Sequence, residues 1–171
     1  LATGETLILT YTVRATDDDS SPASDDQTVT ITITGTNDTP DITVETDDAD
    51  AASLTENGSG LSASDTLSVV DLDVSDVVTA SVESVAVSGT GSANIPLSNA
   101  ALEAMLSVNA SAVLDGTTSG EGTTNELTWT FDSSTEDFSE LAGGETLILT
   151  YTVRATDDDG TPAFDDQTVT I

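Results

Sequence analysis

Apolar and polar residues alternate along several short stretches of the chain, which is the pattern of half-buried β-strands. Leu7–Arg14 places Leu, Tyr and Val on one face, and Thr28–Ile33 alternates Val or Ile with Thr. The acidic turn Thr16–Pro22 lies between these two runs. The pattern therefore predicts a β-hairpin with a long acidic loop, and residues 147–153 and 167–171 predict a second copy of it.

The remaining pattern predicts more strands and at most one short helix. A helix is expected near residues 98–107, because Ser98 can cap its first turn and apolar residues then recur at helical spacing. Gly116–Gly122 is expected to be a loop. Further strands are expected over Asp41–Val44, Leu54–Glu56, Leu67–Val70, Val77–Val87, Val108–Leu114 and Leu127–Phe131. Many short strands with turn residues between them predict an all-β fold, an antiparallel β-sandwich.

The two ends of the chain repeat each other. Residues 1–31 and 141–171 match at 27 of 31 positions, with an offset of 140 residues. Ile171 corresponds to Ile31, which lies inside a strand-like run, so we interpret the sequence as a window from a longer tandem array. A single module with duplicated ends is the alternative. In the tandem interpretation, residues 1–39 are the C-terminal hairpin of a preceding repeat plus a joint, and residues 40–171 are one β-sandwich repeat with a truncated last strand.

Composition then narrows the functional classes. The chain carries 32 acidic and 2 basic residues, a formal charge of −30 that would repel nucleic acids and anionic membrane surfaces. It has no Lys, His or Cys, which excludes His-based catalytic triads, Schiff-base lysines and zinc sites built on His or Cys. No apolar run approaches the roughly 18–20 residues of a membrane span, so no membrane insertion is expected. We expect no enzyme, because no pair of carboxylates stands out as a catalytic pair.

The acidic residues gather in turns, often with Asp-x-Asp spacing, as in Asp17–Asp19, Asp71–Asp73 and Asp157–Asp159. Short carboxylates on loops suit Ca²⁺, which takes about six to eight oxygen ligands. A bound cation would also relieve the repulsion between neighbouring carboxylates. The alternatives are a solvated acidic surface and an acidic surface of the halophilic kind. Neither Asp-rich loop matches the helix–loop–helix calcium motif, so a calcium site must be assembled from separate loops.

Five segments resemble the VCBS repeat, and together they extend over nearly the whole chain: Gly144–Val153, Asp157–Gly160, Thr28–Pro40, Leu127–Phe131 and Leu67–Asp76. The resemblance implies an Ig-like or cadherin-like β-sandwich that occurs in tandem in very large bacterial surface and secreted proteins, including biofilm adhesins of the repeats-in-toxin type. It implies an extracellular location at the bacterial cell surface, with neighbouring identical repeats as end-to-end partners. In such proteins the repeats mostly hold a distal binding region away from the cell.

Cadherin-like arrays bind calcium between domains, and their pattern uses an early Glu, an Asp-x-Asp loop and an Asn-Asp joint. The joint here lacks the extra acids of a typical cadherin joint, so the number of ions per joint stays open. The Asp-rich loop that occurs in both hairpins is either a separate site or a solvated turn. The candidate metal ligands are therefore Asn37, Asp38, Glu56, Asp71, Asp73, Asp157, Asp159, Asp17 and Asp19.

The leading hypothesis is a calcium-stiffened extender repeat of a long bacterial extracellular fibre or biofilm adhesin. One alternative is the subunit of a non-covalent surface filament, in which residues 1–35 add strands to a neighbour's sheet. Another is a carbohydrate-binding or surface-ligand-binding module, for which Phe164 is the one aromatic candidate. Phe164 replaces Ser24 of the first copy, and a local packing variation is the other interpretation of that difference.

Overall fold

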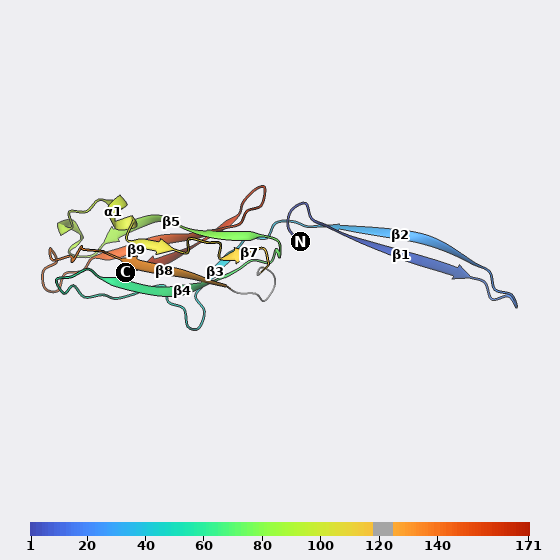
Figure 1. Ribbon diagram of the computed structural model, residues 1–171, viewed down its shortest axis with the longest axis horizontal. Coiled ribbons are helices and arrows are strands. Elements are labelled where there is room, and N and C mark those ends of the chain that lie inside the picture. Colours follow the sequence, from blue (N-terminus) through green and yellow to red (C-terminus); the bar gives the residue numbers. More distant parts are fainter. Residues whose placement is uncertain (118–124) are drawn as a thin grey trace.

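The computed structural model describes residues 1–117 and 125–171, which form a long hairpin and a strand-rich body (Figure 1). In the hairpin, β1 (Thr6–Thr16) pairs antiparallel with β2 (Ser24–Thr34) along its whole length. The base of the hairpin is tightly closed, because a Cβ on Gly35 would collide with the carbonyl oxygens of Leu1 and Ala2. The predicted hairpin with its acidic loop is confirmed.

The described part of the body contains two four-stranded antiparallel sheets. In one, the strand order is β10–β9–β5–β7, with β5 at Val77–Ser88, β7 at Leu114–Asp115, β9 at Ile148–Thr156 and β10 at Phe164–Thr170. In the other, the order is β3–β4–β8–β6, with β3 at Asp41–Thr43, β4 at Ser62–Val70, β6 at Leu106–Val108 and β8 at Asn125–Asp132. The expectation of an all-β fold with antiparallel sheets is confirmed.

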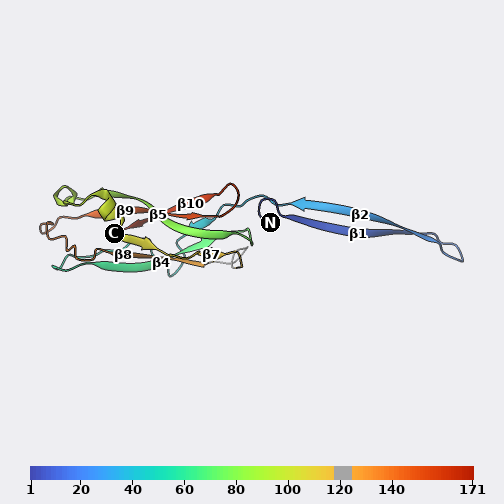
Figure 2. The ribbon, with the colours of Figure 1, turned by 45° about the horizontal axis from the view of Figure 1, so that its top comes forward.

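In the body, β5, β9 and β10 lie on one side and β4 and β8 on the other (Figure 2), and residues of both sheets share one hydrophobic core. Trp129 and Phe131 enter it from β8, and Tyr151 enters it from β9, with the rings of Phe131 and Tyr151 6.4 Å apart between centroids. Their polar atoms are also satisfied, since Trp129 Nε1 donates to the Ala49 carbonyl and the Tyr151 hydroxyl to the Leu102 carbonyl. The alternation of apolar and polar residues along β8 and β9 therefore sets their inner faces.

The one predicted helix is present as α1 (Asn99–Glu103), and a 3₁₀ turn, η1 (Ser92–Asn94), precedes it. Ser98 caps α1, because its Oγ accepts a hydrogen bond from the backbone N–H of Ala101 at 3.2 Å. The helix is shorter than the predicted range, since Leu106 already begins β6. Among the described residues, no helix has the length and apolar character that crossing a membrane requires.

Two predicted strands are wrong. Residues 54–56 make no ladder; the segment is held instead by one bridge between Ala51 and Thr170, while Leu54 packs on the core. Residues 108–114 are split between β6 and β7, because Asn109 Oδ1 accepts the backbone N–H of Thr128 at 2.6 Å and so ends the β6 pairing. Of the predicted loop 116–122, residues 118–122 lie outside the described residues.

The hairpin projects from one end of the body as a separate arm, and the N-terminal residue lies at the junction (Figures 1 and 2). Its large apolar surface residues, which include Leu7, Ile8 and Tyr11, are between 44% and 60% exposed. The structure therefore has a short joint, residues 35–40, between an arm without a core of its own and a body with a complete core.

Candidate metal centre

Three acidic segments meet where the arm joins the body. They are the joint residues after β2, the loop between β4 and β5, and the loop between β9 and β10. Hydrogen bonds tie them together: the Asn37 amide nitrogen donates to Asp157 Oδ2 at 3.0 Å, and the Asp38 backbone N–H donates to Asp73 Oδ2 at 2.7 Å. The Thr3 backbone N–H also donates to Asp159 Oδ2 at 3.3 Å. Two of these contacts fix the Asn-Asp joint against carboxylates of the body.

Three carboxylates converge in this joint. Asp71, Asp76 and Asp157 each place one carboxylate oxygen within 4.8 Å of the others. All three residues are buried, with 1%, 2% and 4% of their surface exposed, respectively. Ca²⁺–oxygen distances are about 2.3–2.6 Å, so oxygens on opposite sides of one ion lie about 4.6–5.2 Å apart. The spacing of the three oxygens therefore suits a single cation.

Tight turns hold these carboxylates in place. Asp71 Oδ1 accepts the backbone N–H of Asp73 at 2.9 Å, which closes the turn that follows β4. Asp157 Oδ1 accepts the backbone N–H of Ala163 at 2.9 Å and of Asp159 at 3.3 Å, which closes the loop before β10. In each case one oxygen organises the loop and the second oxygen is left to face the joint.

Asn37 Oδ1 and Asp71 Oδ2 are buried in the joint and accept no hydrogen bond from the described residues, and Asp73 Oδ1 has the Leu1 amino group beside it. An unsatisfied buried acceptor typically costs about 1–3 kcal/mol, so such atoms call for a partner. The arginines do not supply it, because Arg14 pairs with Asp26 and Arg154 pairs with Asp166, each at 2.7 Å. A hard cation bound by Asn37, Asp71, Asp76 and Asp157 fits this donor set, since all four offer oxygen.

Burial and the crowding of carboxylates in the joint raise the pKa values of two of them, Asp71 and Asp76. Burial raises the pKa of Asp71, and the nearby carboxylates of Asp73 and Asp157 raise it further. Burial also raises the pKa of Asp76 to about 7, with repulsion from Asp159 as the next contribution. Without a cation, ionisation of these groups therefore opposes folding, and a divalent ion would reverse the sign of that effect.

The metal-free chain is expected to lose stability as pH rises from about 4 to about 7. The pKa of Asp76 is about 7 in the folded state and 3.8 in the unfolded state, so between these pH values the folded state holds a proton that the unfolded state has lost, and stability falls as pH rises. Thermal unfolding followed by circular dichroism in a chelating buffer measures the slope. Asp76→Asn should flatten it, and a slope unchanged by this substitution would contradict the assignment.

The structure brings six of the nine predicted ligands to the joint: Asn37, Asp38, Asp71, Asp73, Asp157 and Asp159. Asp73 belongs to a different contact from the cluster, since its Oδ2 accepts from Asp38 and its Oδ1 lies 3.2 Å from the Leu1 amino group. Asp76 completes the cluster but was not among the predicted ligands. Asp76 lies in the same acidic turn as Asp71, and this position could have indicated it. The Asp-x-Asp spacing instead indicated Asp73.

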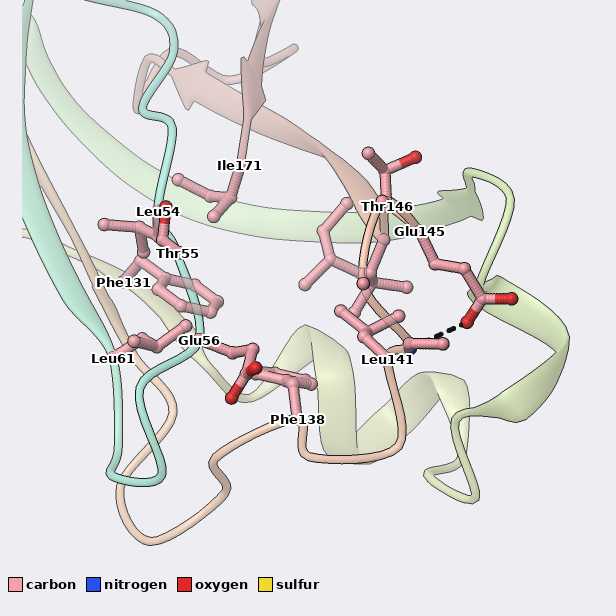
Figure 3. A pocket seen from close by; sticks show the side chains of 15 residues that line it. Leu54, Thr55, Glu56, Leu61, Phe131, Phe138, Leu141, Glu145, Thr146 and Ile171 are labelled. Atoms are coloured by element: carbon pink, nitrogen blue, oxygen red, sulfur yellow. Dashed lines mark hydrogen bonds between the residues drawn. The ribbon is translucent and has the colours of Figure 1, made fainter.

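The other three predicted ligands lie elsewhere. Glu56 is exposed and lies beyond the opposite end of β4, where it lines an apolar pocket (Figure 3). Asp17 and Asp19 lie at the tip of the arm, in the loop between β1 and β2. There Asp17 Oδ1 accepts the backbone N–H of Ala23 at 3.0 Å, as Asp157 Oδ1 does from Ala163. The loop at the tip of the arm therefore has the same turn as the loop of Asp157. At the tip, however, this turn is not in contact with counterparts of Asn37, Asp71 and Asp76.

No protein-family model, curated protein or solved structure matches this chain.

Proposed function

We propose that this chain is a structural repeat of a long bacterial extracellular fibre or biofilm adhesin, in which calcium stiffens the joints between successive repeats. The observation that carries the proposal is a cluster of three buried carboxylates of the body at the joint, Asp71, Asp76 and Asp157. Asn37, on the arm side, donates its amide N–H to one of them, Asp157. The proposal also draws on the resemblance to the VCBS repeat and on the 27 of 31 positions shared by the two hairpins.

The mechanical role follows from which residues share the ion. Asn37 lies in the joint, whereas Asp71 and Asp157 belong to loops that the sheets of the body anchor. Bending the joint would move the Asn37 oxygen away from the other ligands, so a bound ion resists bending. Without the ion, hydrogen bonds such as those from Asn37 and Asp38 to carboxylates of the body hold the joint, and they resist bending less than a shared ion would. Calcium therefore acts as a stiffener and the array as a rod.

In a tandem array, the three predicted metal ligands that lie away from this joint would lie at other joints. Asp17 and Asp19 correspond to Asp157 and Asp159, so in a tandem array they face the joint at the far end of the preceding repeat. Glu56 lies beside Ile171 at the other end of the body, where a following repeat would begin. Each repeat then contributes ligands to both of its joints, and its partners are identical neighbours placed end to end.

The geometry of Phe164 gives less support to the alternative in which the repeat itself binds a ligand. Its side chain is 49% exposed, but the Arg154 guanidinium carbon lies over the ring, 3.7 Å from the centroid. One face of the ring is therefore occupied by a cation–π contact and is not free to stack on a sugar. This contact gives the Ser24-to-Phe164 difference a local packing role.

Joint stiffness can be measured with a pair of spin labels, because the chain has no cysteine of its own. Thr28→Cys on the arm and Ser107→Cys on the body place one label on each side of the joint, at exposed positions. We expect a narrow distance distribution in calcium and a broad one in chelator. The Asp71→Asn variant should give a broad distribution in both buffers. Equal widths for the parent protein with and without calcium would overturn the proposal.

A further inference from the structure

Asn57 is the one asparagine of the chain that a glycine follows. Both residues are exposed, in the segment that leads to β4, and Gly58 has a φ of +76°. A Cβ on Gly58 would have no other part of the chain within 4 Å, so this position needs glycine for its backbone conformation and not for lack of space. No side chain on residue 58 therefore hinders contact between the Asn57 carboxamide and the Gly58 nitrogen.

The Gly58 nitrogen is also free of hydrogen bonds, since its N–H donates to no group of the described residues. Other asparagines are followed by a bonded N–H. After Asn37, the Asp38 N–H donates to a carboxylate of Asp73 at 2.7 Å. An amide nitrogen must lose its proton before it attacks a carbonyl carbon, and a hydrogen bond from the N–H holds that proton in place. The Gly58 nitrogen is under no such restraint.

Two donors of Ser59 hold the side-chain oxygen of Asn57. Oδ1 accepts the backbone N–H of Ser59 at 3.1 Å and the Ser59 hydroxyl at 2.5 Å. When a nucleophile adds to the side-chain amide carbon, negative charge develops on this oxygen, and donors aimed at it stabilise the transition state. The N–H and hydroxyl of Ser59 are therefore arranged as an oxyanion hole for attack on Asn57.

We propose that Asn57–Gly58 is a self-modifying site that converts Asn57 into isoaspartate and aspartate, with Ser59 as the oxyanion donor. The Gly58 nitrogen gives up its proton and bonds to Asn57 Cγ, the bond from Cγ to the side-chain nitrogen breaks, and ammonia leaves. The product of this step is a cyclic succinimide.

Water completes the reaction by adding to one of the two ring carbonyl carbons and breaking its bond to the Gly58 nitrogen. Opening at Cγ gives aspartate at position 57. Opening at the backbone carbonyl carbon leads the main chain through Cγ and gives isoaspartate. Water is the only co-reactant, and nothing is oxidised or reduced.

The modification changes the exposed segment and leaves the core in place. The Leu61 N–H donates to Ser133 Oγ at 2.8 Å, and a Cβ on Gly60 would collide with the Ser134 carbonyl oxygen, so the chain is fixed from Gly60 onward. The additional main-chain carbon of isoaspartate is accommodated before that point. The product carries one more negative charge, beside Glu56. This site lies at the opposite end of β4 from the metal centre and reacts without calcium, so it is independent of the calcium joint.

The test is incubation of the full chain in chelator at physiological temperature, followed by peptide mapping with mass spectrometry. We expect aspartate and isoaspartate to accumulate at position 57, with isoaspartate identified by enzymatic methylation. The rate should rise with pH, because the nucleophile is a deprotonated amide. Asn99 is also exposed, but Ala100 follows it in α1, so it is the internal control and should keep its amide. Asn57→Gln should stay unmodified over the same time, since its longer side chain does not form the succinimide.

A pair of Ser59 variants separates the oxyanion donor from simple exposure of an Asn-Gly pair. Ser59→Ala keeps the backbone N–H and loses the hydroxyl, and should slow the reaction by about two- to tenfold, the factor that one hydrogen bond typically contributes. Ser59→Thr keeps a hydroxyl and should react at nearly the parent rate. An Asn57 amide that persists, equal rates for the parent and Ser59→Ala, or equal modification of Asn99 would each overturn the proposal.

Discussion

Calcium in hundredfold excess over its dissociation constant is expected to raise the melting temperature of the chain by about 5–11 °C. Binding one ion to the folded state alone adds about 2.7 kcal/mol of stability under these conditions. A change of 1 kcal/mol shifts the melting temperature of a domain of this size by about 2–4 °C. The gain has a clear physical source, because the ion supplies a partner for Asn37 Oδ1 and Asp71 Oδ2 and offsets the repulsion among the buried carboxylates.

The repeat provides a matched control for this effect. Asp157 and Asp17 occupy the same position in two hairpins, and both hold their loop through a hydrogen bond from an alanine N–H. Asp157→Asn should remove most of the calcium-induced shift, because the substitution takes a charged ligand from the joint. Asp17→Asn should keep the shift, since the tip of the arm lies away from that joint. Scanning calorimetry with calcium and with chelator measures both, and equal behaviour of the two variants would disprove the site.

Truncation of Tyr151 is expected to cost much more stability than truncation of its counterpart in the arm. Tyr151→Ala should lower the free energy of unfolding by about 3–5 kcal/mol, because the ring is fully buried against Phe131 and its hydroxyl donates to the Leu102 carbonyl. Tyr11→Ala should change it little, since Tyr11 is 50% exposed. The sequence around the two tyrosines is the same, so the difference isolates the contribution of the core.

Urea denaturation of the two variants in chelator, followed by tryptophan fluorescence, makes this comparison. Trp129 is the chain's single tryptophan and lies in the core that Tyr151 helps to fill. Similar losses of stability from both substitutions would mean that the arm is covered in solution. That result would contradict the exposed arm.

Much of the fold could be predicted because its elements depend on local patterns. Alternation of Val, Ile and Leu with Thr is enough to define the hairpins, and a Ser before a helical apolar pattern is enough to define α1. Prediction failed where a side chain or a neighbour replaced the regular pairing. Asn109 ends β6 by taking the place of a backbone partner, and the segment at Leu54 lies beside β10 with a single bridge.

The candidate site could be predicted only in part, because its members come from three loops far apart in the sequence. Acidic turns at strand ends indicated Asp71 and Asp157, and the Gly-Pro-bounded joint indicated Asn37. Which acids share one cavity depends on how β4, β9 and the joint come together, and spacing along the chain does not contain that information. For this reason Asp76 was missed, and Glu56 was grouped with residues that lie at the other end of β4.

The most direct test is a crystal structure of this chain grown in millimolar calcium, with anomalous scattering used to locate the ion. We expect an anomalous peak in the joint, with Asn37 Oδ1 and carboxylate oxygens of Asp71, Asp76 and Asp157 at about 2.3–2.6 Å from it. A well-ordered joint without such a peak, or a calcium ion bound only at the tip of the arm, would contradict a metal-held joint.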